Sequence, residues 1–256
     1  MLVSAQQGHP GSVLSQIEIL VSLFYGDIMR YEKNNPNSKT RDKIIISKGH
    51  SAMGLYPIFA DLGYFDKNEL NKFGTTKGFL RIFGNINIPG IDATSGSLGH
   101  GPGIGAGYAL AAKHDNSNQR TFVIVSEGEM YEGSIWETAL FASHNKLDNL
   151  VLILDRNNKI ILGDTEDLVA LEPIQNKWES FGFKAIRVNG HSFGELMNAF
   201  SNIGSTNGKP LIIIADTVKG KGISFMENEP SWHYWQGLND NQLKMAREDL
   251  KKIDDR

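Results

Sequence analysis

Short apolar runs rich in β-branched residues alternate along the chain with longer segments whose apolar residues recur at helical spacing. The runs are predicted to be strands, and they occupy residues 43–47, 121–125, 150–155, 183–188 and 210–215. The longer segments are predicted to be helices, and they occupy residues 12–29, 49–62, 97–113, 134–145 and 193–203, with one more around Trp178. Residues 74–90 have no clear period and are predicted to form a loop. Apolar strands separated by helices predict an α/β fold with a doubly wound, mostly parallel sheet and helices on both faces.

The predicted sheet indicates where a ligand should bind. In open parallel sheets, ligands bind beyond the carboxyl ends of the strands. In this chain those positions are the residues that follow Ser47, Val125, Asp155 and Thr217. Candidate chemistry is therefore sought there first.

Length and composition limit the possible classes of protein. The 256 residues contain no linker-like segment and no cysteine, so we expect a single domain over residues 1–256 without disulfides or thiolate metal sites. The formal charge of −3 provides no overall basic field, so nucleic acid and anionic membranes are not expected partners. No signal peptide is visible and the apolar runs are too short to span a bilayer, which favours a cytoplasmic protein.

An acidic segment and an amide follow two of the predicted strands. Glu127 lies two residues after the end of one predicted strand, and Asn157 lies two residues after the end of the next. Their oxygens, with a backbone carbonyl and diphosphate oxygens, could complete an octahedral shell for Mg²⁺. Gly128 would let the backbone approach a phosphate, and a helix N-terminus after it would favour negative charge. Glu127 taken alone would favour a solvated acidic loop instead.

The spacing of these residues resembles a known motif. Enzymes that use thiamine diphosphate carry Gly-Asp-Gly with an asparagine about thirty residues later, and Glu127 and Asn157 occupy those two positions. The segment 126–149 closely resembles the N-terminal portion of transketolases. Four further motifs resemble that family in the family's order: Gly8-His-Pro-Gly11, Ser47-Lys-Gly-His-Ser51, Ser95-Gly-Ser-Leu-Gly-His-Gly101, and residues 219–228 with Trp232-His233.

The resemblance implies a thiamine diphosphate-binding fold and a role for each matching residue. Metal ligands for Mg²⁺ (or Ca²⁺ or Mn²⁺) would be Glu127, Asn157 and the carbonyl of Lys159. Residues that bind the cofactor would be His50, Gly96, Leu98, Gly128, Glu129, Asn157 and His233. Catalytic residues lining the substrate channel would be His9, His50 and His233. Imidazoles suit proton exchange with a polyol near neutral pH.

The resemblance also implies a function and a partner. The chain would be the N-terminal subunit of a heteromeric transketolase, a transferase that moves a two-carbon ketol unit from a ketose (phosphate) to an aldose. Full-length transketolases continue into a module whose glutamate activates the aminopyrimidine ring, whereas this sequence ends at Arg256. A C-terminal partner subunit would then be required, in a heterotetramer with two copies of each chain. Its contacts are expected on the helices at 97–113 and 134–145, near Glu132 and Glu137, with Trp136 as an anchor.

Two departures from the family's pattern keep alternatives open. Glu127 replaces the usual aspartate and is one methylene longer, and residues 79–84 lack the family's Gly-His substrate motif. The chain could therefore be half of another thiamine diphosphate-dependent carboligase or synthase, or a non-catalytic cofactor-binding homologue. A dinucleotide-binding domain is disfavoured, because no acidic residue follows Gly99-x-Gly101-x-Gly103 at the ribose position. Of the other histidines, His100 is a possible site residue, while His114, His144 and His191 are expected to be structural.

Overall fold

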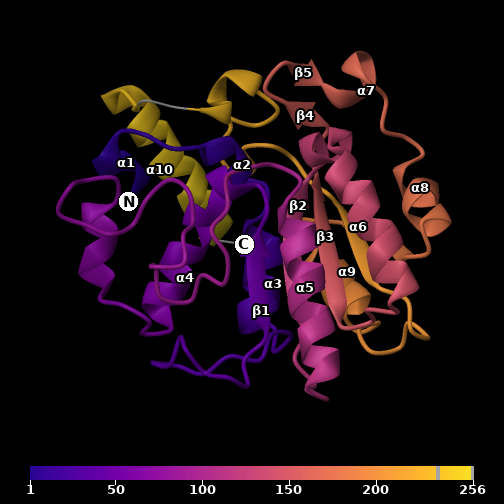
Figure 1. Cartoon of the computed structure of the whole chain (residues 1–256). Coiled ribbons are helices and arrows are strands. Elements are labelled where there is room, and N and C mark those ends of the chain that lie inside the picture. The colour runs from indigo at the N-terminus through magenta and orange to yellow at the C-terminus, as the bar shows by residue number, and fades with distance from the viewer. Residues whose placement is uncertain (235–236, 255–256) are drawn as a thin grey trace.

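The computed structural model describes residues 1–234 and 237–254, and its centre is a five-stranded parallel sheet (Figure 1). The strands are β1 (Lys43–Ile46), β2 (Thr121–Ser126), β3 (Leu150–Arg156), β6 (Lys184–Asn189) and β7 (Leu211–Asp216). They lie in the order β1-β2-β3-β7-β6, and every neighbouring pair is parallel. The predicted parallel α/β sheet is therefore confirmed.

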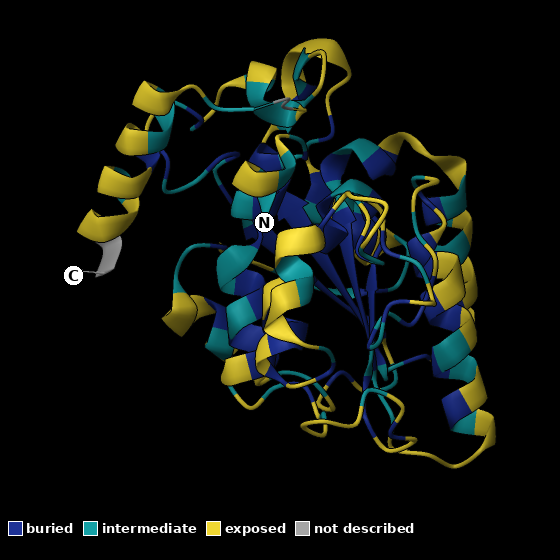
Figure 2. Cartoon of the chain, turned by 90° about the vertical axis from the view of Figure 1, so that its left-hand side faces the viewer, coloured by how far each residue is buried: buried dark blue, intermediate teal, exposed yellow. Residues whose placement is uncertain are grey.

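Helices cover both faces of the sheet. One face is covered by α3 (Ile17–Tyr25), α4 (Leu55–Asp61) and α9 (Phe193–Phe200), and the other by α5 (Gly101–His114), α6 (Gly133–His144) and α8 (Ile174–Ser180). Successive strand residues point to opposite faces, so Ile44 and Ile46 pack in the first core cluster while Ile45 packs in the second. Figure 2 shows the buried strands at the centre and, around them, helices in which buried and exposed residues alternate. This is the predicted doubly wound arrangement.

Several helix boundaries differ from the sequence-based prediction, and two of the differences have a clear physical cause. The single helix expected over 12–29 is divided into α2 (Pro10–Leu14) and α3 at Ser15 and Gln16, whose side chains bond to Asp155 and to the Ser51 carbonyl. The helix expected from residue 97 begins at Gly101, because the preceding loop contains Gly99 in the left-handed region (φ 80°).

The remaining elements are short or lie at the periphery. They are α1 (Leu2–Ala5), η1 (Gly49–Gly54), η2 (Lys67–Lys72), η3 (Glu127–Tyr131), β4 (Lys159–Ile160), β5 (Gly163–Asp164), α7 (Thr165–Leu168), η4 (Pro230–His233) and α10 (Asp240–Asp254). The antiparallel hairpin β4–β5 was not predicted, since two-residue strands carry no period. Helix α10 was also not predicted. Within the described ranges, no helix combines the length and the apolar character needed to cross a membrane.

Two glycines of α5 provide a matched test of its packing on the sheet. A Cβ on Gly105 would lie 2.5 Å from Cγ2 of the buried Val123, whereas a Cβ on Gly107 would meet nothing within 4 Å. We expect Gly105→Ala to lower the free energy of unfolding by about 1–3 kcal/mol through overpacking. Gly107→Ala should raise it by up to about 1 kcal/mol, because alanine favours the helix. Urea unfolding of both variants measures this, and equal stabilities would contradict the packing of α5 on β2.

Candidate functional site

A cavity of about 170 Å³ opens where β1, β2, β3 and β7 end. It is lined by Ser12, Lys48, His50, Leu98, Ser126, Glu127, Gly128, Asn157, Lys159, Ile160, Ile161, Lys219 and His233. The structure thus brings together seven residues singled out from the sequence, namely His50, Leu98, Glu127, Gly128, Asn157, Lys159 and His233. The parallel register explains this convergence, because Ser126 lies opposite Asp155 and Arg156 lies opposite Asp216.

Two buried lysines in this cavity were not assigned a role from the sequence. Lys48 follows β1 and Lys219 follows β7, and each is only 1% exposed. Two ammonium groups that share a small cavity suit an anionic ligand such as a diphosphate. The available signal was their position directly after strand ends, where ligands of parallel sheets bind. Ser12, at the start of the chain, had no comparable signal.

Lys48 is held by a completely buried carboxylate. Asp155, in β3, pairs with Lys48 and also accepts hydrogen bonds from Ser15 and Thr217. Burial alone would raise the pKa of the Asp155 carboxyl, but the Lys48 ammonium and the two hydroxyls outweigh it and lower the pKa below its ordinary value. Lys48 Nζ also donates to the Ser12 carbonyl at 3.1 Å. The pair therefore fixes the lysine at the cavity wall.

Lys219 occupies a different electrostatic environment. Burial, aided by the nearby Lys48 charge and opposed by Glu127, lowers the pKa of Lys219 to about 8. Its Nζ lies 3.0 Å from Nδ1 of His233. Lys219 thus remains mainly protonated at pH 7 and has a histidine within hydrogen-bond distance.

Three histidines form a cluster beside the cavity. The ring centroids of His9, His50 and His233 lie 5.0–5.5 Å apart. Burial, together with neighbouring lysines, lowers the pKa of His9 and of His233 to about 4 and that of His50 to about 2. Each ring is therefore neutral at pH 7, and a neutral imidazole offers one donor and one acceptor.

Two aromatic rings lie beside this histidine cluster, and one of them comes from residues 79–84, the loop that lacks the family's Gly-His motif. Phe83 lies in that loop, 44% exposed, with its ring centroid 6.4 Å from that of His9. Tyr234 approaches the same histidine from the other end of the chain, at 5.0 Å between centroids. A phenyl ring offers no hydrogen bond, so Phe83 contributes an apolar surface in place of an imidazole.

Glu127 and Asn157, the two side chains expected to bind a metal, both line the cavity. Glu127 is 1% exposed; its Oε2 accepts hydrogen bonds from Arg156 and from the Asn158 amide, while its Oε1 is buried without a partner among the described residues. Burial raises the pKa of Glu127 to about 7, with the Arg156 charge acting in the opposite direction. Asn157 Oδ1 accepts a hydrogen bond from the backbone amide of Lys159 at 3.2 Å.

The protein alone supplies an incomplete set of metal ligands. No group of three or more His, Asp or Glu side chains suited to a metal ion occurs within residues 1–234 and 237–254. The carboxylate oxygen of Glu127 that has no partner among the described residues and the Asn157 amide are oxygen donors that suit a hard cation whose shell is completed by ligand oxygens. The donor set therefore fits a divalent metal held jointly with a diphosphate.

Glu129, Gly96 and His9 do not line the cavity, although direct roles were expected for them. The buried Glu129 carboxylate accepts hydrogen bonds from Ser47 and from the amides of Gly99 (2.9 Å) and Ser126 (2.7 Å). It therefore positions the glycine loop whose Leu98 reaches the cavity. Gly96 lines an adjacent hollow of about 310 Å³ together with His100. The ring centroid of His9 lies 5.0 Å from that of His50 and 5.5 Å from that of His233, two residues that do line the cavity.

His191, which was expected to be structural, is bonded away from the cavity. Its Nε2 accepts the Val218 amide at 2.8 Å, and its Nδ1 lies 3.1 Å from a Glu18 carboxylate oxygen. His191 therefore holds the segment that leads from β7 to Lys219.

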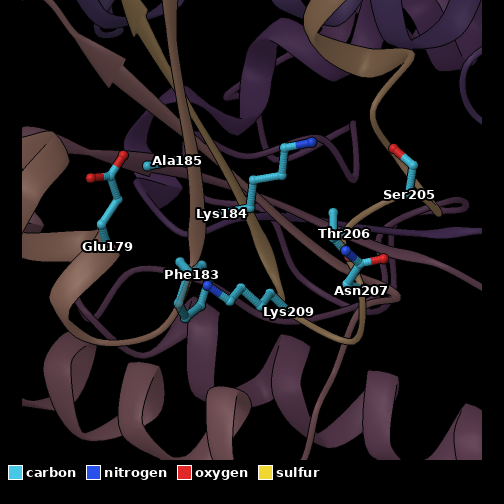
Figure 3. A pocket seen from close by; sticks show the side chains of 8 residues that line it. All are labelled: Glu179, Phe183, Lys184, Ala185, Ser205, Thr206, Asn207 and Lys209. Atoms are coloured by element: carbon cyan, nitrogen blue, oxygen red, sulfur yellow. The ribbon is translucent and has the colours of Figure 1, made fainter.

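A larger hollow, of about 470 Å³, lies at the opposite end of the sheet (Figure 3). Its labelled side chains come from α8, from the start of β6 and from the loop before β7. These are the amino ends of the strands, where parallel sheets do not usually bind ligands. Volume alone is therefore a poor guide here, and the smaller cavity is the candidate site.

The fold and the site together define the class of protein. A cavity at the carboxyl edge of a doubly wound sheet, with two buried lysines beside Glu127 and Asn157, suits an anionic ligand bound together with a cation. The chain belongs to the transketolase family, since residues 1–252 match the family model described as transketolase, thiamine diphosphate binding domain.

Similar proteins include both separate subunits and longer transketolases. An apulose-4-phosphate transketolase subunit of Phocaeicola vulgatus is 36% identical over 254 residues, which cover 99% of this chain and 90% of that protein. The 6-deoxy-6-sulfo-D-fructose transketolase subunit of a Clostridium species is 35% identical over 96% of this chain and 89% of its own length. The transketolase structure from Campylobacter jejuni has a TM-score of 0.91 and 29% identity, covering 98% of this chain but 40% of that one.

The histidine cluster yields a prediction about protonation. Nuclear magnetic resonance titration of the folded chain should show His9 and His233 changing charge near pH 4, far below the ordinary value of 6.5. Unfolded histidines bind protons as the pH falls below 6.5 while these two do not, so the free energy of unfolding should decrease between pH 6.5 and 4. Variants with His9→Gln and His233→Gln assign the signals. Titration of either ring near pH 6.5 would contradict the buried arrangement.

Proposed function

We propose that this chain is the N-terminal, thiamine diphosphate-binding subunit of a heteromeric transketolase. The complex would transfer a two-carbon ketol unit from a ketose (phosphate) to an aldose. The observation that carries this proposal is the convergence of Lys48, Lys219, Glu127 and Asn157 in one cavity of a transketolase-family domain. Additional support comes from relatives named as transketolase subunits, whose whole length this chain nearly spans.

Each wall of the cavity would bind a different part of the ligand. Lys48 and Lys219 would neutralise diphosphate oxygens, and Gly128 would allow a close backbone approach. Glu127, Asn157 and the Lys159 carbonyl would hold Mg²⁺, or Ca²⁺ or Mn²⁺ in its place. When bound, thiamine diphosphate supplies the means of stabilising a carbanion, and the protein orients it and excludes water.

The three histidines would bind the substrate. As neutral rings, His9, His50 and His233 can each accept a hydrogen bond from one hydroxyl and donate a hydrogen bond to another. A contact with Ser12 orients the His50 ring, because its Nε2 lies 3.1 Å from the Ser12 hydroxyl. Phe83 would exclude a polar substituent from one wall, which favours a sugar other than the family's usual substrates.

A partner subunit would supply the glutamate that activates the aminopyrimidine ring. Its contact surface would include α5 and α6, which pack side by side (Figure 1). Their outer faces carry the small residues Gly103, Gly107 and Ala111 and the exposed apolar residues Ile104, Leu140 and Phe141. Small residues permit close helix packing, and burying these exposed apolar side chains against a partner would stabilise the contact. We propose two copies of each subunit, acting in the cytoplasm.

Trp136, the expected anchor of that interface, is partly buried against its own chain. It stacks at 5.1 Å between ring centroids on Trp178 and on Phe181, and its indole nitrogen donates to the Met130 carbonyl at 2.9 Å. Leu140, which is 60% exposed one helical turn further along α6, is the better candidate.

Activity should require the partner. We expect no ketol transfer from a ketose phosphate by the purified chain, and measurable transfer when it is combined with the C-terminal transketolase subunit. Equal turnover by the chain alone would contradict the two-subunit proposal. Absence of turnover with that partner, while thiamine diphosphate still binds, would favour the non-catalytic alternative.

Two leucine variants test the proposed interface in the same assay. Leu140→Asp should weaken association by at least about tenfold, as expected for a charge placed in an apolar contact. Leu250→Asp on α10 is the matched control, because Leu250 is also exposed (47%) but lies outside α5 and α6. Analytical ultracentrifugation measures association, and equal effects of the two changes would exclude this surface.

A further inference from the structure

Arg156 is a buried cation that does not line the cavity but contacts Glu127, which does, and the proposed function does not use it. It is fully buried in β3, between Asp155 and Asn157 in sequence, and it pairs with Glu127. Its Nη1 also donates to the Thr165 hydroxyl at 2.8 Å, and its Nη2 lies 2.6 Å from Glu166. A guanidinium with this many fixed partners has little freedom to rotate.

The contact with Arg156 divides the two oxygens of Glu127 into different roles. Oε2 accepts from Arg156 and from the Asn158 amide, at 3.0 Å in the second case. Oε1 is buried with no partner in the described part of the chain, although Glu127 lines the cavity. One oxygen is therefore anchored, and the other remains available to a cation.

The fixed position of Oε2 accounts for how Glu127, which is one methylene longer than the family's aspartate, can still present an oxygen at a defined place. A glutamate has one more rotatable bond than an aspartate, so a free Glu127 could place its oxygens at several depths in the cavity. Anchoring Oε2 removes that freedom. The Arg156 side chain is itself held by Thr165 and Glu166 of α7. Glu172 also lies 3.5 Å from Arg156 Nη2.

We propose that Arg156 is a positioning residue that holds Glu127 by one oxygen and so presents the other to the divalent metal. This inference rests on the proposed function only in assuming a cation beside the diphosphate. Partners that orient a metal ligand typically change metal affinity by about 10–100-fold when they are removed. Arg156 acts through Glu127 and need not touch the cofactor or the substrate.

The test is a titration of Mn²⁺, followed by electron paramagnetic resonance, with the full chain and saturating thiamine diphosphate. Arg156→Met should weaken Mn²⁺ binding by about tenfold or more. Thr165→Val removes one contact of Arg156 but no charge, so it should fold normally and weaken binding by a smaller factor. Arg187→Met is the control, because Arg187 bonds to Glu172 and Asp216 in the same network without touching Glu127. It should leave Mn²⁺ affinity unchanged.

A double-mutant cycle separates positioning from general damage. Glu127→Asp shortens the side chain and withdraws it from Arg156, so adding Arg156→Met to Glu127→Asp should cost much less than it costs in the wild type. Unchanged Mn²⁺ affinity in both the Arg156→Met and the Thr165→Val variants would overturn this inference but leave the proposed cofactor site intact. Thermal unfolding shows whether the Arg156→Met variant folds. If it does not fold, the Mn²⁺ affinity of the Thr165→Val variant tests the inference in its place. No Mn²⁺ binding by the wild type would overturn both the proposed cofactor site and this inference.

Discussion

The buried ion pair between Lys48 and Asp155 is the constraint on which the carboxyl edge of the sheet depends. Removing two charges from water costs several kcal/mol per ion unless geometry and further hydrogen bonds compensate. Here Ser15, Thr217 and the Ser12 carbonyl provide those bonds. They come from the α2–α3 junction and from the segment after β7, so satisfying the pair joins these segments to β1 and β3. It also leaves a lysine at the wall of the cavity.

Two neighbouring glutamates then serve different purposes. Glu129 has its carboxylate oxygens occupied by Ser47, Ser126 and Gly99, and so it fixes the loop that contributes Leu98. Glu127 has only one oxygen occupied among the described residues. Because a buried polar atom without a partner is costly, the free oxygen is evidence for a ligand that the protein itself does not provide. The neutral histidines beside it complete a site suited to binding hydroxyl groups without adding charge.

The sequence predicted the sheet, its helices and the edge at which the site lies, because these follow from local periodicity and from the geometry of parallel strands. The family resemblance identified most of the residues lining the cavity. Long-range contacts could not be predicted in this way. The break between α2 and α3 depends on Ser15 and Gln16 reaching Asp155 and Ser51. The contact between Arg156 and Glu127 joins residues 29 positions apart, and the inward stacking of Trp136 depends on Trp178 and Phe181.

The central claim is that one cavity at the end of the sheet binds a diphosphate and a metal together. A crystal structure of the chain with thiamine diphosphate and Mn²⁺, using anomalous scattering to locate the metal, tests it most directly. We predict diphosphate density beside Lys48 and Lys219, with an anomalous peak coordinated by Glu127 Oε1, Asn157 and the Lys159 carbonyl. Cofactor density at another place, such as the hollow beside Phe183 and Lys209, or a metal that does not contact Glu127, would contradict the account.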